Sequence, residues 1–223
     1  MKRCVIFDLD GTLCDTSRDL LAAANTALAH LGRDVRLDPE AEADRATALK
    51  GGRAMLRLGL SRVGAVDDAE VDRGYRPLLD AYDAAICRET VFYPGALDAV
   101  HRLRDRGDAV GICTNKPEGL ARKLMAALEA DHLFDSLVGA DRLPVRKPDP
   151  EHLFEAVRDA AGDRGRTVLI GDTKTDRDTA QRADVPCVLV TFAPGGSEVA
   201  ALSPEGLLHD YADLDGLVDA LLP

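Results

Sequence analysis

The sequence predicts an α/β fold built on a parallel, doubly wound sheet, with a helical segment inserted after the first strand. Short apolar runs recur along the chain and alternate with amphipathic helical patterns, an order typical of parallel sheets. Between residues 16 and 87 helical periodicity replaces this alternation. Two acids, Asp8 and Asp10, directly follow the first apolar run, and open α/β sheets bind ligands at the carboxyl ends of their strands.

Mainly apolar runs of strand length indicate strands that are buried on both faces. The runs are residues 3–7, 109–114, 136–139, 167–171 and 187–192. Helical patterns cover residues 101–106, 118–130 and 150–161. Strands and helices therefore alternate along the second half of the chain, as crossover connections between parallel strands require.

The helical segment begins with apolar residues at helical spacing between Leu20 and Leu31, and Gly32 is expected to end that helix. Asp38-Pro39 predicts the next helix start, with Pro at the first helical position. Gly51-Gly52 interrupts the following stretch, and residues 67–86 predict a further helix.

These patterns predict a core of residues 1–15 and 91–223 and an α-helical cap of residues 16–90. The helices could merely widen one layer of the core. We favour a lid over the carboxyl ends of the strands, because the segment leaves the chain at the turn that carries Asp8 and Asp10. Residues 14–17 and 88–94 would be its hinges.

The composition limits the partners that the chain can have. Its 223 residues carry a formal net charge of −11, which argues against nucleic acid because that partner needs a basic face. The five cysteines are odd in number and widely spaced, so we expect a reducing cytoplasm rather than a disulfide framework. No apolar run reaches the roughly 18 residues of a membrane span. The oligomeric state does not follow from the sequence.

Polar side chains follow four of the predicted strands, and strand ends of a parallel sheet share one edge. These side chains belong to Asp8, Asp10, Thr114, Asn115, Lys116, Lys147, Asp172 and Asp176. Each short motif taken alone is a common surface turn. Their placement after successive strands makes one shared site the better interpretation.

Phosphoryl transfer uses these residue types. Asp8 can attack phosphorus and form an aspartyl-phosphate. Asp10 lies two residues on, at the same side of an extended chain, and can protonate the leaving oxygen and then activate water. Carboxylates 4 Å apart repel by about 4 kcal/mol at an effective dielectric of 20, and Mg²⁺ would offset this cost. Asp8, Asp172 and the Asp10 carbonyl are the expected metal ligands.

The remaining polar residues complete the predicted site. Lys147 would supply positive charge to the transferring oxygens and to Asp8. Thr114 and Asn115 would hydrogen-bond those oxygens, and Asp176 would orient Lys147 or the metal. The substrate is therefore expected to be a small phosphorylated metabolite.

The motifs FDLDGT, TNK, KPDP and GDTKTD together resemble those of the haloacid dehalogenase superfamily. The resemblance spans residues 7–176 and implies a Rossmann-like core, a mobile helical cap and Mg²⁺. It implies the same roles for Asp8, Asp10, Thr114 and Lys147, with Asp8, Asp10 and Asp172 at the metal. The strings DLDGTLCDTSRDL, FYPGALDAVHRLRDRG and TNKPEGLARKLM are similar to phosphoglycolate phosphatases.

A substrate such as 2-phosphoglycolate needs a cation for its carboxylate. Lys50 and Arg53 flank the Gly51-Gly52 break in the predicted cap and are candidates, although an ordinary solvated basic pair explains them equally well. Other activities stay open: a sugar phosphomutase of the β-phosphoglucomutase type, a pyrophosphatase or broad sugar phosphatase, and, less favoured, a 2-haloacid dehalogenase. A phosphate-binding interaction protein is the non-enzymatic alternative.

Overall fold

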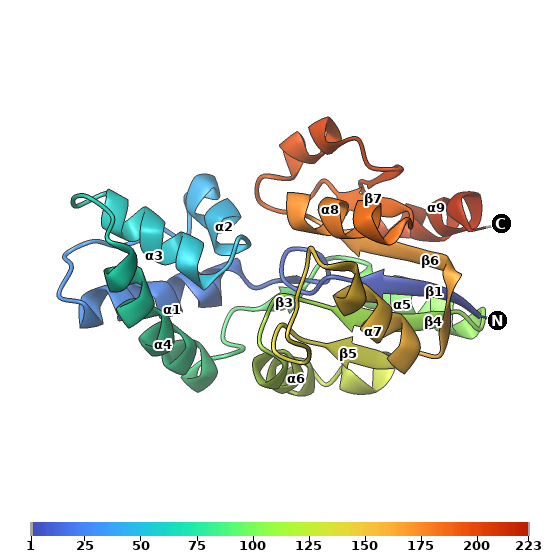
Figure 1. Cartoon of the computed structure of the whole chain (residues 1–223), viewed down its shortest axis with the longest axis horizontal. Coiled ribbons are helices and arrows are strands. Elements are labelled where there is room, and N and C mark those ends of the chain that lie inside the picture. The colour runs from blue at the N-terminus through green and yellow to red at the C-terminus, as the bar shows by residue number, and fades with distance from the viewer. Residues whose placement is uncertain (1, 223) are drawn as a thin grey trace. The chain divides into compact units, whose positions relative to one another are not determined.

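The computed structural model describes residues 2–222, which form two compact units (Figure 1). One unit contains the chain up to Cys14 and again from Phe92 onward. The other unit is Asp15–Val91. The first unit holds the main sheet and the second is helical, so the predicted α/β class with a helical insertion is confirmed.

The main sheet has six parallel strands in the order β5-β4-β1-β6-β7-β8. Their bounds are β1 Lys2–Phe7, β4 Ala109–Cys113, β5 Ser136–Val138, β6 Gly162–Gly171, β7 Cys187–Val190 and β8 Gly206–Leu208. β1 lies at the centre, and four successive residues, Cys4 to Phe7, are fully buried. Because successive side chains point to opposite faces, both faces of the sheet must be covered.

Helices of the first unit connect these strands. They are α5 Ala96–Asp105, α6 Glu118–Ala127, α7 Pro150–Asp159, α8 Lys174–Ala183 and α9 Leu214–Leu221, with 3₁₀ turns at Asp131–Leu133, Gly196–Leu202 and Tyr211–Asp213. Residues of α7 and α8, among them Leu153 and Ala180, pack with Cys4 and Ile6 in one apolar cluster. The Asp149 carboxylate accepts a hydrogen bond from the backbone of Glu151, which fixes the start of α7.

The helical unit contains α1 Ser17–His30, α2 Glu42–Ala48, α3 Gly52–Ser61 and α4 Asp68–Ala84. Leu28, Leu56 and Leu78 are buried within it. Gly51 has a φ of +95° directly before α3, a conformation that glycine adopts without strain and that explains the break at Gly51-Gly52. The short strands β2 Cys14–Asp15 and β3 Val91–Phe92 lie where the chain passes between the two units.

The predicted helix start at Asp38-Pro39 is wrong, since α2 begins at Glu42. The Asp38 carboxylate and carbonyl instead accept hydrogen bonds from the backbones of Glu40 and Ala41, which closes a turn. The Asp38 amide donates to the Asp44 carboxylate at 2.7 Å, and this contact holds the turn against α2. Asp-Pro favours both turns and helix starts, and here these tertiary contacts select the turn.

Within the helical unit, the buried Asp19 carboxylate fastens the segment after α4 to α1. It accepts hydrogen bonds from the backbone amides of Arg88, Glu89 and Thr90 at 3.0–3.2 Å and from the Thr90 hydroxyl at 2.7 Å. A carboxylate with this many donors needs no ion pair to remain buried.

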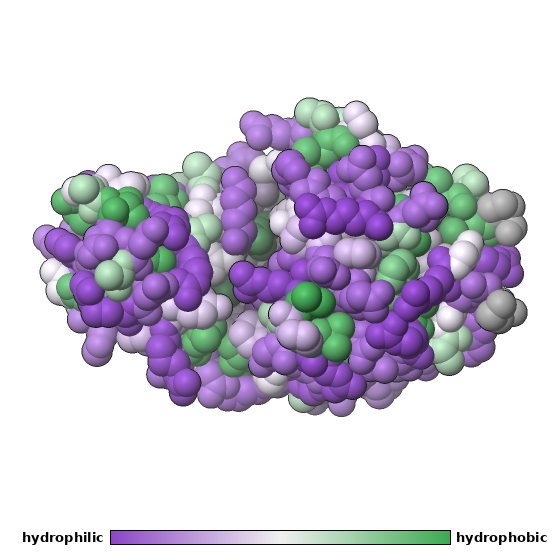
Figure 2. All heavy atoms as spheres, in the orientation of Figure 1, coloured by the Kyte–Doolittle hydropathy of each residue, from purple (hydrophilic) through white to green (hydrophobic). Residues whose placement is uncertain are grey.

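Among residues 2–222, all five cysteines are free, and Cys87 is the one that is not buried. No helix in this part of the chain combines the length and apolarity that a membrane crossing requires. The face seen in Figure 2 is mostly hydrophilic, with apolar residues scattered over it.

Candidate active site

The ends of β1 and β6 bring two distant acids together. Phe7 pairs with Ile170 in the sheet, and the Asp8 amide donates to the Ile170 carbonyl at 2.8 Å. Asp172 follows β6 by one residue. Carboxylate oxygens of Asp8, Asp172 and Asp176 all lie within 4.8 Å of one another. Asp8 thus lies beside two acids that are 164 and 168 positions away in the sequence, Asp172 and Asp176, and Asp176 is on the first turn of α8.

Lys147 lies inside this cluster of acids. Its ammonium nitrogen is 3.1 Å from Asp8 Oδ2 and 2.6 Å from Asp176 Oδ1. The Lys147 side chain is 1% exposed and that of Asp176 is fully buried. Lys147 thus contacts both Asp8 and Asp176. Charge compensation of Asp8 by Lys147, and orientation of Lys147 by Asp176, stay predictions.

Burial and like charge shift the proton equilibria of the cluster. Burial raises the pKa of Asp8 to about 6, with Asp176 and Asp10 adding to the rise and Lys147 opposing it. The pKa of Asp172 also lies well above its ordinary value because of burial and the charges of Asp176 and Asp8. Burial lowers the pKa of Lys147, but the two carboxylates beside it more than reverse that effect.

These shifts describe a site with surplus negative charge. Three carboxylates lie together and two of them contact one ammonium group, and the oxygens are the hard donors that Mg²⁺ and Ca²⁺ prefer. A divalent cation would remove the surplus and return the carboxyl groups to their ionised form. The cluster of Asp8, Asp172 and Asp176 is therefore a candidate metal site, in which Asp176 already bonds Lys147 and Thr173 and Asp8 and Asp172 are the candidate ligands.

Smaller residues fix the acids in place, and the sequence analysis missed them. The Thr12 hydroxyl donates to Asp172 Oδ1 at 3.1 Å, and the Thr173 hydroxyl donates to Asp176 Oδ2 at 2.6 Å. A Cβ atom at Gly171 would lie 2.4 Å from the Cβ and Cγ atoms of Asp176, so only glycine admits this approach. The glycine directly before Asp172 was the available signal.

Asp10 is held by a different cation. Lys116 Nζ lies 2.8 and 3.0 Å from the two carboxylate oxygens of Asp10. The Lys116 side chain is 3% exposed and that of Asp10 is 17% exposed. The sequence placed Lys116 at this edge of the sheet but did not identify its partner.

Thr114 and Asn115 follow β4 at the same edge. Thr114 is buried, and its hydroxyl accepts a hydrogen bond from the Lys116 amide at 3.2 Å. The Asn115 side-chain amide donates to the Lys147 carbonyl at 3.0 Å. Asn115 therefore connects the polar residues after β4 to the segment that carries Lys147. Its predicted contact with a phosphate stays a prediction.

Lys50 and Arg53 lie in the helical unit. Arg53 forms an ion pair with Asp72, and its guanidinium carbon is 4.5 Å from the centre of the Tyr75 ring. Lys50 is exposed at the end of α2. These contacts give Arg53 a role in joining α3 to α4, and substrate binding by either residue stays a prediction.

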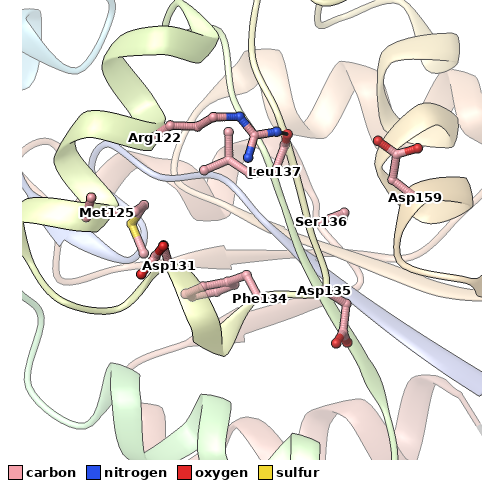
Figure 3. A pocket seen from close by; sticks show the side chains of 9 residues that line it. Arg122, Met125, Asp131, Phe134, Asp135, Ser136, Leu137 and Asp159 are labelled. Atoms are coloured by element: carbon pink, nitrogen blue, oxygen red, sulfur yellow. Dashed lines mark hydrogen bonds between the residues drawn. The ribbon is translucent and has the colours of Figure 1, made fainter.

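A cavity of about 450 Å³ lies elsewhere in the first unit, where β5 begins (Figure 3). Its walls include Arg122, Phe134 and Asp135, and Arg122 donates a hydrogen bond to the carbonyl of Leu137. None of the predicted site residues line it. Because ligands of such sheets bind at the opposite, carboxyl ends of the strands, this cavity is not the candidate active site.

The family comparison agrees with the fold. The family described as haloacid dehalogenase-like hydrolase matches residues 5–190, and the chain belongs to that family. It is a phosphatase of this family, as relatives that align over nearly their whole length also indicate.

Two of these relatives are named phosphoglycolate phosphatase. The one from Mesorhizobium japonicum is 37% identical over 208 residues, covering 93% of this chain and 90% of the relative. The one from Caulobacter vibrioides is 36% identical over 212 residues, covering 94% and 88%. A solved haloacid dehalogenase-like hydrolase from Streptococcus pneumoniae shares the fold with a TM-score of 0.80 at 21% identity, covering 96% of this chain and 97% of that one.

Proposed function

We propose that this phosphatase requires Mg²⁺ and hydrolyses 2-phosphoglycolate to glycolate and phosphate through an aspartyl-phosphate on Asp8. The observation that carries the proposal is the position of the Asp8 carboxylate, which lies beside the buried Lys147 ammonium and within 4.8 Å of Asp172 and Asp176. The names of the relatives support the choice of substrate.

The reaction consists of two displacements. An Asp8 carboxylate oxygen attacks phosphorus, and the bond between phosphorus and the glycolate oxygen breaks while Asp10 donates a proton to that oxygen. Asp10 then takes a proton from water, whose oxygen attacks phosphorus and breaks the bond to Asp8. Phosphate leaves, and both aspartates return to their starting state.

The protein supplies charge and position for both steps. Lys147 compensates the negative charge near Asp8, and Asp176 holds the ammonium group in place. Thr114 and Asn115 would donate hydrogen bonds to the phosphoryl oxygens. Asp8, Asp172 and the Asp10 carbonyl would hold Mg²⁺. When bound, the ion would supply positive charge that stabilises the phosphoryl oxygens.

The helical unit is proposed to act as the cap. Residues 16–90 would cover the carboxyl ends of the strands, and residues 14–17 and 88–94 would be the hinges. Lys50 and Arg53 are proposed to face the substrate from the cap. Alanine variants test this role, because an unchanged KM for 2-phosphoglycolate in both would remove it.

Phosphate release tests the proposed function. Purified protein is given 2-phosphoglycolate, sugar phosphates, pyrophosphate and 2-chloropropionate, with Mg²⁺ or with a chelator. We expect free phosphate from 2-phosphoglycolate at the highest kcat/KM, and none after chelation. Isomerised sugar phosphate without free phosphate would show a mutase instead, and no reaction with any compound would refute an enzymatic function.

A further inference from the structure

The Lys116 ammonium is a second buried cation at the edge of the sheet, distinct from Lys147. It contacts both carboxylate oxygens of Asp10, at 2.8 and 3.0 Å. Its backbone is fixed on both sides, because the Lys116 amide donates to the Thr114 hydroxyl and its carbonyl accepts from the Ala140 amide at 2.9 Å. A lysine held this firmly is prepared for a defined contact rather than for general solubility.

The sheet register places this pair beyond the ends of β1 and β4. Phe7 pairs with Ile112, so Asp10 and Lys116 lie three and four residues past a matched pair of neighbouring strands. Lys147 already forms ion pairs with Asp176 and with Asp8, the residue proposed to attack phosphorus. Lys116 is the cation of the first unit that directly contacts the residue proposed to protonate the leaving oxygen.

The contact between Lys116 and Asp10 indicates which charge the leaving group carries. In a phosphorylated 2-hydroxy acid, the carboxylate carbon is two bonds from the oxygen that receives the proton from Asp10. The carboxylate of the substrate therefore arrives close to the carboxylate of Asp10. Once Asp10 has given its proton to the leaving oxygen, two carboxylates at that distance repel strongly unless a cation lies between or beside them.

We propose that Lys116 binds the carboxylate of the leaving group and thereby makes the enzyme selective for phosphorylated carboxylic acids over neutral phosphate esters. This inference rests on the proposed function and adds the residue that selects the substrate class. It assigns the cation that selects the substrate class to the first unit, so that contacts from Lys50 or Arg53 would add to this selection rather than create it. A neutral leaving group would gain nothing from this ammonium group beyond its effect on Asp10.

Two substrates of similar size separate the two effects of Lys116. The measurement is kcat/KM for 2-phosphoglycolate and for 2-hydroxyethyl phosphate, in wild-type protein and in Lys116→Gln. We expect wild-type protein to prefer the acid. We expect the variant to lose that preference by about 10- to 100-fold, the range that corresponds to one hydrogen bond to a charged group. Lys123→Gln, an exposed lysine on α6, is the matched control and should keep the preference.

Each outcome decides one question. Equal losses with both substrates would mean that Lys116 acts on Asp10 alone, and the inference would be overturned while the proposed function stands. If Lys116→Gln does not fold, the wild-type ratio decides, because an enzyme with no preference for the acid contradicts the inference. Absence of phosphate release from every ester by wild-type protein would instead refute the proposed function.

Discussion

Removal of the Lys147 charge is the perturbation whose effect the structure predicts most fully. Lys147→Met keeps most of the side-chain volume but leaves Asp8 and Asp176 without the ammonium group that lies 3.1 and 2.6 Å away. Because the Lys147 side chain is 1% exposed, water cannot replace the lost charge. We expect the metal-free variant to be strongly destabilised.

The magnitude follows from burial and distance. Breaking a buried ion pair by removing one partner costs about 3–5 kcal/mol. Coulomb's law supports this size, since two carboxylates 4.8 Å apart repel by about 3.5 kcal/mol at an effective dielectric of 20. Lys174→Met is the control, because Lys174 pairs with Asp178 at the surface, is 70% exposed and should contribute less than about 1 kcal/mol.

Urea unfolding in the presence of a chelator measures the effect. The account predicts a loss of about 3–5 kcal/mol for Lys147→Met, and recovery of much of it when Asp176→Asn is added, because the second change removes one of the repelling charges. Equal urea midpoints for wild type and Lys147→Met would refute the electrostatic description of the site. So would an additive, rather than compensating, effect of the second substitution.

Three further predictions follow from individual contacts. Asp8→Asn should abolish phosphate release yet fold. Burial raises the pKa of Asp8 to about 6. In metal-free wild type the protonated Asp8 side chain is therefore tolerated below about pH 4, and its ionisation lowers the free energy of unfolding as the pH rises through 6. The variant should therefore gain about 2–3 kcal/mol relative to wild type in urea unfolding between pH 4 and 7. Gly171→Ala should displace Asp176 and lower kcat at least tenfold, and an unchanged kcat would contradict the close packing. Asp19→Ala should cost about 3 kcal/mol in thermal unfolding, because it leaves the Thr90 amide and hydroxyl without their acceptor.

Much of the fold could be predicted because the buried parts of the central strands are mainly apolar runs. β1 and β4 are recognisable in the sequence since every position from Cys4 to Phe7 and from Ala109 to Cys113 is buried. β8 was missed because, of the three residues Gly206–Leu208, only Leu208 is buried, whereas the equally short β5 is buried throughout. The start of α2 was misplaced because tertiary contacts decide between a turn and a helix at Asp38.

The sequence predicts which polar residues lie at the strand ends. It does not predict which lysine contacts which carboxylate. Topology alone brings Asp8, Lys147 and Asp172 to one edge. Which cation faces which carboxylate depends on side-chain conformations, so Lys116 appeared in the sequence only as a polar neighbour and in the structure as the partner of Asp10. Arg53 likewise faces Asp72 of α4, a contact with no periodic signal.

Chemical trapping during turnover tests the central claim most directly. Protein is mixed with 2-phosphoglycolate and Mg²⁺, quenched and reduced with borohydride, which converts a phosphorylated aspartate into homoserine that mass spectrometry can locate. The account predicts homoserine at position 8, and none when substrate is omitted. Homoserine at Asp10, Asp172 or Asp176 in its place would contradict the assignment of Asp8 as the nucleophile.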